Sequence, residues 1–260
     1  MGQRVALVTG GMGGLGEAIC IKLDGMGIKV VVTYSPGNAK HADWLKEMEG
    51  QGHKFVAFPC DVSDYESCQK TIAQVTKDVG PVDILINNAG HSSKARNVRW
   101  VTQDDWDAVI NVNLTGVYAL IQAVLPGMIE RGGGTIVTVG SVAALRPGLI
   151  GGAPYGAAKA GVLNLMGHVH TVLRDKGIRA TTVMPAEVDT PILDNRPLPP
   201  DATARATMML PEDVAEAIMM CVTLPERTVV EEIVLSPTRT RDQSRDIAVS
   251  RDLGAPPGVK

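Results

Sequence analysis

The sequence predicts an α/β fold in which helices flank a doubly wound parallel sheet. Short runs of β-branched residues alternate with amphipathic stretches from the first residues to about position 237, the pattern of parallel strands joined by crossover helices. A glycine-rich turn separates the first strand from the first helix. The 260 residues, 45% of them hydrophobic, can build one sizeable core and show no low-complexity linker, so we expect a single domain.

Strands and helices are predicted in strict alternation. The strands are expected at residues 4–9, 28–34, 54–59, 82–87, 133–139, 178–184 and 231–236. The helices are expected at residues 14–26, 38–49, 64–79, 102–130, 154–175 and 211–223. Thr102 with Asp105 predicts a capping box, and Pro211 suits the first turn of a helix. Right-handed crossovers between seven such strands give one doubly wound sheet.

Two segments break this alternation. Residues 187–210 are rich in proline and poor in periodic apolar positions, which fits either a mobile loop over the site or a surface excursion. Residues 238–260 alternate arginine with aspartate and are expected to form a frayed or partner-docked tail. The domain is therefore expected to span residues 1–237, including the substrate loop 187–210.

The composition favours a small-molecule substrate. The formal net charge is −3 without long runs of like charges, so neither nucleic acid nor an anionic membrane is an expected partner. Apolar runs such as 28–32 are too short to span a bilayer, and no signal peptide is expected before the glycine turn. The four cysteines lack Cys-x-x-Cys spacing, which favours reduced thiols in a cytoplasmic protein and no metal site.

The glycine-rich turn at residues 9–16 reads Thr-Gly-Gly-Met-Gly-Gly-Leu-Gly. Glycines let the backbone turn tightly and approach a pyrophosphate, which then lies at the positive end of the following helix. Strand, turn and helix occur in the order of the dinucleotide-binding fingerprint, so we expect a Rossmann fold that binds a dinucleotide. The candidate cofactor-binding residues of the turn are Gly10, Met12, Gly14, Leu15 and Gly16.

The end of the second strand favours NADP(H) over NAD(H). An NAD-selective site places an acidic residue there to bind the ribose 2′-hydroxyl, but this sequence has none and continues through Ser35 to Lys40. Ser35 can donate a hydrogen bond to a 2′-phosphate, and Lys40 can supply positive charge. The alternative is that Lys40 only begins a solvated helix.

The ends of the third and fourth strands carry further candidates for the cofactor site. Ligands of such sheets bind outside the carboxyl ends of the strands, so these residues border the same crevice as the glycine turn. Asp61 can accept a hydrogen bond from the adenine amine, although it can also cap the helix that follows. The other candidates at these strand ends are Val62, Asn88, Ala89 and Gly90.

Tyr155 and Lys159 lie four residues apart near the start of a predicted helix, so they share one face. An ammonium beside a phenol lowers the tyrosine pKa from its reference value of about 10, which suits general acid/base chemistry. Ser141 ends the fifth strand and places a hydroxyl at the same crevice. Asn113 lies among apolar helix neighbours, where an amide usually has a buried partner or a function.

These motifs together resemble the short-chain dehydrogenase/reductase family. The resemblance rests on residues 9–16, Asn-Asn-Ala-Gly at 87–90, Asn113, Ser141 and Tyr155-x-x-x-Lys159, and it covers nearly the whole chain. It implies that Tyr155 gives a proton to a carbonyl oxygen while the nicotinamide delivers hydride to the carbon. It also implies that Ser141 holds that oxygen, Lys159 bonds the nicotinamide ribose, and Asn113 anchors a water in the proton relay.

The segment after the sixth strand, Pro185-Ala186-Glu187-Val188-Asp189-Thr190, is also implicated by the resemblance. Thr190 would contact the nicotinamide carboxamide and Pro185 would lie against the ring, with Val188 as a further cofactor contact. The family usually has Pro-Gly where this chain has Pro185-Ala186. Alanine resists positive φ, so this departure could tighten the local backbone.

The substrate is left open by the two halves of the chain. The first ~125 residues resemble the acetoacetyl-CoA reductases, whereas the second half resembles broad-range oxidoreductases of small hydroxy acids and ketones. We expect NADPH-dependent reduction of a ketone or 3-oxoacyl group; the alternatives are a dehydrogenase of small 3-hydroxy acids or other secondary alcohols, and a non-catalytic dinucleotide sensor. Basic residues that could receive coenzyme A, or be scattered surface charge, are Arg96, Arg99, Arg146 and Arg196.

The resemblance also implies a homotetramer in which the helices at 102–130 and 154–175 pack against symmetry mates. The second of these helices is apolar around much of its girth, as a buried or interface helix must be.

Overall fold

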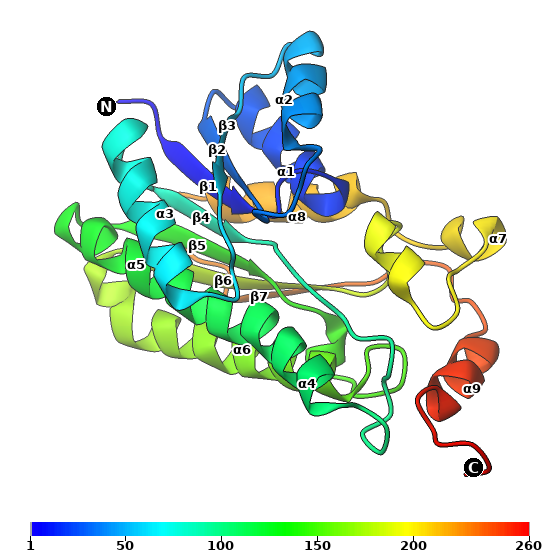
Figure 1. The fold of residues 1–260 in the computed structure, drawn as a ribbon. Helices are drawn as coiled ribbons and strands as arrows, with labels where there is room; N and C mark the ends of the chain where they lie inside the picture. Colours follow the sequence, from blue (N-terminus) through cyan, green and yellow to red (C-terminus); the bar gives the residue numbers. More distant parts are fainter. Residues whose placement is uncertain (1, 260) are drawn as a thin grey trace.

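The computed structural model, which describes residues 2–259, contains one seven-stranded sheet in the order β3-β2-β1-β4-β5-β6-β7 (Figure 1). All neighbouring strands run parallel. The strands are β1 (Val5–Thr9), β2 (Lys29–Tyr34), β3 (Val56–Pro59), β4 (Ile84–Asn87), β5 (Gly134–Val139), β6 (Ile178–Pro185) and β7 (Glu232–Leu235). This is the doubly wound Rossmann order extended by β7, so the predicted fold class is confirmed.

Helices cover both faces of the sheet (Figure 1). They are α1 (Gly14–Gly25), α2 (His41–Gly50), α3 (Tyr65–Asp78), α4 (Gln103–Ile110), α5 (Gly116–Glu130), α6 (Ala153–Leu173), α7 (Ala202–Arg205), α8 (Pro211–Thr223) and α9 (Ser244–Asp252). Because side chains of a strand alternate between faces, β1 contributes to both apolar cores. Ala6 and Val8 pack with α1 and α8, whereas Val5 and Leu7 pack with α3, α5 and α6.

The helix expected at 102–130 is interrupted by a π-helical turn at Asn111–Thr115, between α4 and α5. The buried amide of Asn113 explains the irregularity: it donates to the Val109 carbonyl one turn earlier, at 2.9 Å, and to the His91 carbonyl, at 2.7 Å. Single π turns inside α-helices often mark functional sites. The predicted cap of α4 is present, because the Thr102 hydroxyl accepts from the Asp105 N–H.

This same region, Gln103–Glu130, is long and apolar enough by composition to cross a membrane, with a mean hydropathy of 1.6. It is longer than the apolar runs considered in the sequence. In the structure 44% of its apolar window is buried, and Leu120, Val124 and Met128 lie in the core beneath the sheet. These residues therefore belong to the apolar core that packs against the sheet.

The two irregular segments contain short helical elements. Loop 187–210 contains a 3-10 turn at Pro191–Asn195 and the short helix α7. The tail was expected to be frayed or docked on a partner, but residues 244–252 form α9, which lies beside the loop that carries α7 (Figure 1). The physical reason is a set of hydrogen bonds from Arg241 and Gln243 in the tail to Glu187.

Candidate active site

A cavity of about 1,130 Å³ opens at the carboxyl ends of the strands. Its walls come from the glycine turn, from the ends of β2 to β6, from the start of α6 and from the loop after β6. The predicted site residues that line it are Gly10, Met12, Gly14, Leu15, Gly16, Ser35, Asp61, Val62, Asn88, Ala89, Gly90, Ser141, Tyr155, Lys159, Pro185, Val188 and Thr190. Within the described part of the chain, Lys40 and Asn113 do not line this cavity.

The glycine turn forms a cradle that only glycine can build. A Cβ on Gly16 would lie 2.2 Å from the Gly10 carbonyl oxygen, so α1 could not approach the end of β1 with any side chain there. Gly13, at the N-terminus of α1, has φ 135° and faces open space, because a Cβ built there would meet no atom within 4 Å. Space in front of unpaired helix N–H groups fits a pyrophosphate.

Asn88 fixes this cradle to the neighbouring strand. Its side-chain amide donates to the carbonyls of Thr9, at 3.0 Å, and Gly10, at 3.1 Å. The Thr9 hydroxyl in turn accepts from the backbone N–H groups of Asn88 and Ala89, both at 3.0 Å. Asn88 therefore borders the cavity and also holds the glycine turn in register with β4.

The part of the cavity next to the ends of β2 and β3 is bordered by Ser35, Asp61 and Val62. Asp61 does not cap α3: Asp64 does, by accepting from the Glu66 N–H. One oxygen of Asp61 instead accepts from the N–H and hydroxyl of Ser63, at 3.0 and 2.6 Å. Lys40 is exposed at the N-terminus of α2, outside the cavity lining, and its contact with a 2′-phosphate stays a prediction.

The predicted chemical groups converge at the other end of the cavity. Lys159 is buried, and its ammonium donates to the Val139 carbonyl at 2.7 Å, which fixes it beneath the end of β5. Burial lowers the pKa of Lys159 to about 8. The ammonium nitrogen lies 5.5 Å from the centroid of the Tyr155 ring. Ser141 accepts a hydrogen bond from the Ala143 N–H at 3.2 Å, which orients its hydroxyl at this end.

The pKa of Tyr155 corrects one expectation. Burial raises it above its ordinary value, against the lowering influence of the Ser141 hydroxyl and of the charges of Arg96 and Arg196. The sequence predicted a net lowering by Lys159, whose ammonium is instead engaged with a backbone carbonyl. The phenol is therefore neutral near pH 7 and suited to donate a proton.

Asn113 is fully buried and lies behind the cavity. Both protons of its amide are donated to backbone carbonyls, and its oxygen accepts from the His91 N–H at 3.3 Å. The side chain thus ties the π turn to the segment that follows Gly90, and this structural bond is independent of the predicted role in a water relay.

The segment after β6 covers the glycine turn. Thr190 and Pro191 come so close to Gly14 that a Cβ there would lie 3.3 to 3.5 Å from their side chains. Ala186 introduces no positive φ, since no described residue other than glycine has one. Its N–H donates to the Leu235 carbonyl at 2.8 Å and simply extends the pairing of β6 with β7.

Charged residues at the substrate end include several that the sequence did not identify. Glu187 is bound by Arg196, by Arg241 at 2.7 and 2.9 Å and by Gln243 at 2.9 Å. Burial alone would raise the pKa of Glu187, but the hydrogen bonds from Arg241 and Arg196 lower it to about 2. The alternating charges of the tail gave no local signal of this network, because the tail partners Arg241 and Gln243 lie 54 and 56 residues from Glu187.

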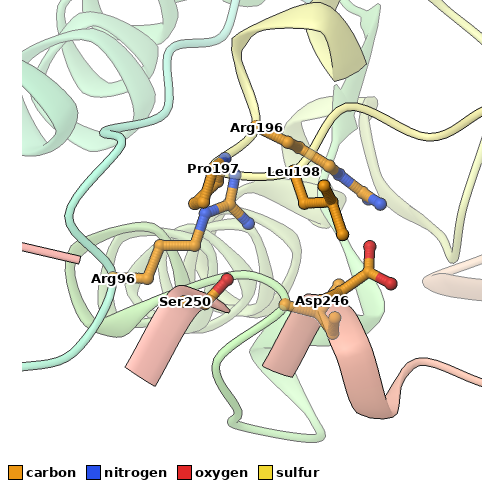
Figure 2. A pocket seen from close by; sticks show the side chains of 7 residues that line it. Arg96, Arg196, Pro197, Leu198, Asp246 and Ser250 are labelled. Carbon is orange, nitrogen blue, oxygen red and sulfur yellow. The ribbon is translucent and has the colours of Figure 1, made fainter. Parts of the chain in front are cut away.

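The four arginines considered from the sequence separate into two groups. Arg96, Arg146 and Arg196 line the cavity, whereas the exposed Arg99 lies over the Trp100 ring at 4.3 Å. Arg96 and Arg196 also border a small pocket beside α9 (Figure 2).

Comparisons with known proteins agree with this geometry. The family model described as short chain dehydrogenase matches residues 4–199. Nodulation protein G of Azospirillum brasilense is 38% identical over 218 residues, which cover 84% of this chain and 82% of the relative. The acetoacetyl-CoA reductase of Cupriavidus necator is 39% identical over 192 residues, or 73% of this chain and 76% of the relative.

Solved structures show the same likeness. An actinorhodin polyketide ketoreductase with NADPH superposes with a TM-score of 0.82 at 29% identity, covering 90% of this chain and 96% of that chain. A metagenomic short-chain oxidoreductase in complex with NADP gives 0.77 at 28% identity, covering 91% and 98%. With a cavity of this construction and these relatives, the chain belongs to the short-chain dehydrogenase family and is an oxidoreductase.

Proposed function

We propose that the protein is an NADPH-dependent ketoreductase that reduces a ketone or 3-oxoacyl group to the alcohol. The observation that carries this proposal is the convergence of Tyr155, Ser141 and Lys159 at one end of a cavity whose other end is the glycine cradle. A dinucleotide held in that cradle supplies the hydride. The described residues supply no cluster of metal ligands, so the proposal includes no metal.

The chain's own residues handle the proton and the oxygen. Tyr155 donates its phenolic proton to the carbonyl oxygen as the carbon accepts hydride, and Ser141 donates a hydrogen bond to the same oxygen. The raised pKa of Tyr155 keeps the phenol protonated, which favours the reductive direction. Lys159 holds the ribose side of the cofactor, and Asn113 keeps the segment after Gly90 in place.

NADPH is the proposed cofactor because no acidic residue follows β2. Ser35 lines that part of the cavity and can donate to a 2′-phosphate. The solved relatives with NADP and NADPH support the same choice. Apparent affinities for NADPH and NADH test it directly: NADPH is expected to bind at least tenfold more tightly, and a preference for NADH would overturn this part of the proposal.

The substrate class follows from one panel of assays. Oxidation of NADPH is followed with acetoacetyl-CoA, with a short 3-oxo acid and with a plain ketone; oxidation of 3-hydroxybutanoate is measured in the reverse direction. Acetoacetyl-CoA reductases and 3-oxoacyl-[acyl-carrier-protein] reductases among the relatives support a 3-oxoacyl group. Tyr155→Phe should abolish turnover while NADPH still binds. Firm NADPH binding without turnover of any carbonyl would favour a dinucleotide sensor.

We also propose a homotetramer in the cytoplasm. On α5 and α6, Tyr118 and Val172 are 44% and 55% exposed, which are apolar surfaces that a symmetry mate could cover. Size-exclusion chromatography with light scattering measures the assembly. A mass of four chains is expected, and a monomer at micromolar concentration would contradict it.

A further inference from the structure

Arg96 is a buried cation that has no anionic partner within the described chain. It is 4% exposed, and its Nε is buried without a hydrogen-bond partner. No carboxylate among residues 2–259 forms an ion pair with it, although ten ion pairs occur elsewhere. A buried charge without a partner is costly, so proteins rarely retain one unless a ligand completes it.

The chain holds Arg96 firmly against the helix that carries Tyr155. The Arg96 carbonyl accepts from the Ala153 N–H at 2.9 Å, in the first turn of α6. Gly152, with φ 84°, packs so closely that a Cβ there would lie 2.9 Å from the Arg96 Cβ. Tyr155, two residues after Ala153, lines the cavity. The backbone and Cβ of Arg96 are therefore held against the first turn of the helix that carries Tyr155.

The neighbouring charges do not neutralise Arg96. Asp246 lines the same small pocket as Arg96 (Figure 2), but its carboxylate accepts two hydrogen bonds from Arg241, at 2.9 and 3.1 Å. Glu187 is shared between Arg196 and Arg241. Two acids and two arginines thus balance one another, and Arg96 remains as one excess positive charge. Its effect reaches the reacting group, since its charge lowers the pKa of Tyr155.

Arg96 borders two spaces of very different size. One is a pocket of only about 10 Å³, lined also by Pro197, Leu198 and residues of α9, which is about the volume occupied by one water (Figure 2). The other is the main cavity of about 1,130 Å³. Only the second space can admit an anionic ligand. Burial and the nearby Arg196 lower the pKa of Arg96 to about 10, which still leaves it charged near pH 7.

We propose that Arg96 binds the carboxylate of the substrate, and that the preferred substrate is a short oxo acid with a free carboxylate rather than a neutral ketone or a thioester. This inference rests on the proposed ketoreductase function and specifies its substrate class. A planar guanidinium recognises a carboxylate by paired N–H donors, and the acid would supply the partner that Arg96 lacks.

The reaction balances without a further reactant. The ketone carbon forms a bond to the hydride of NADPH, the carbonyl oxygen takes the proton of Tyr155, and the products are a hydroxy acid and NADP⁺. The phenolate regains its proton from solvent. The carboxylate on Arg96 remains ionised and unchanged, so it positions the ketone and takes no part in the electron transfer.

The test compares an acid with its neutral ester. The kcat/KM for 3-oxobutanoate and for methyl 3-oxobutanoate is measured with NADPH, together with acetoacetyl-CoA, for the wild type and for Arg96→Gln and Arg96→Lys. The wild type should prefer the acid. Arg96→Gln should lower the ratio of kcat/KM for the acid to kcat/KM for the ester on the order of 100-fold. Arg96→Lys, which keeps the charge, should recover part of that selectivity. Arg99→Gln is the matched control, because Arg99 lies in the same segment outside the cavity.

Each outcome decides the proposal. A wild type that reduces the ester or thioester as well as the acid would overturn it. A folded Arg96→Gln variant whose kcat/KM falls equally for acid and ester would also overturn it. If neither variant folds, inhibition of the wild type by butanoate but not butanamide supports the carboxylate site, and equal inhibition refutes it.

Failure of the proposed function is distinguishable from failure of this inference. If no carbonyl is reduced, binding of 3-hydroxybutanoate to the NADPH-loaded protein is measured from nicotinamide fluorescence. If 3-hydroxybutanoate binds saturably and Arg96→Gln weakens this binding, the carboxylate site is supported even so. If no saturable binding is found, the carboxylate site is overturned. Arg96→Met should also raise the melting temperature by about 3 °C, since it removes an uncompensated buried charge.

Discussion

Glu187→Gln tests how strongly the tail is bound to the substrate end of the cavity. The hydrogen bonds from Arg241 and Arg196 lower the pKa of Glu187 from its ordinary value of 4.5 to about 2. Each unit of pKa corresponds to about 1.4 kcal/mol, so the ionised carboxylate contributes about 3 kcal/mol to the free energy of unfolding at neutral pH. Because the folded-state pKa lies below the ordinary value, this stabilisation is complete above about pH 4.5 and is lost as the pH falls toward 2.

Urea unfolding at several pH values, followed by circular dichroism, measures the effect. At pH 7 Glu187→Gln should unfold with about 3 kcal/mol less free energy than wild type, and the difference should shrink below pH 4.5. Glu49→Gln is the control, because Glu49 is exposed on α2. A loss below 1 kcal/mol at pH 7, or a difference that does not change with pH, would refute the reasoning.

Three further predictions concern the cofactor, the proton and the tail. Gly16→Ala should weaken NADPH binding at least tenfold by fluorescence titration, because its Cβ would lie 2.2 Å from a carbonyl oxygen, whereas Gly25→Ala in the same helix meets no atom within 4 Å and should bind normally. The pH profile of reduction should fall near pH 8 as Lys159 loses its proton and again above about pH 10 as Tyr155 does; a profile flat through pH 8 would exclude a role for the charged lysine. Deleting residues 238–260 should lower kcat/KM for the substrate at least tenfold and leave NADPH affinity within threefold, and equal losses would show that the tail supports the whole fold.

The sheet could be predicted from the sequence because its signals are local. Alternating strands and helices, and the glycine turn after β1, fix the order of elements without knowledge of any distant contact. The convergence of Ser141 and Tyr155 followed from the rule that ligands bind at the carboxyl ends of strands. The comparisons bear out the family that these motifs indicated.

What the sequence could not provide depends on partners distant in the chain. The Lys159 ammonium is engaged by the carbonyl of Val139, 20 residues away, so the four-residue spacing from Tyr155 alone gave the wrong direction for the tyrosine pKa. Lys40 has the right chemistry for a phosphate but lies exposed at the N-terminus of α2 and does not line the cavity. Glu187 acquires its importance only from the tail, and no periodicity relates residues so far apart.

The positions of the cavity residues along the chain also set the order in which the parts of the cavity wall are synthesised. The residues that form the glycine cradle and the ends of β1 to β6 precede position 191, whereas Arg241, Gln243 and Ile247 of the cavity wall are made after them. In a nascent chain the residues of the cradle and of these strand ends are therefore made before this part of the cavity wall. A chain that stops before residue 238 would keep the residues of the cradle and lose this part of the wall, and a bulky fusion after α9 would adjoin it.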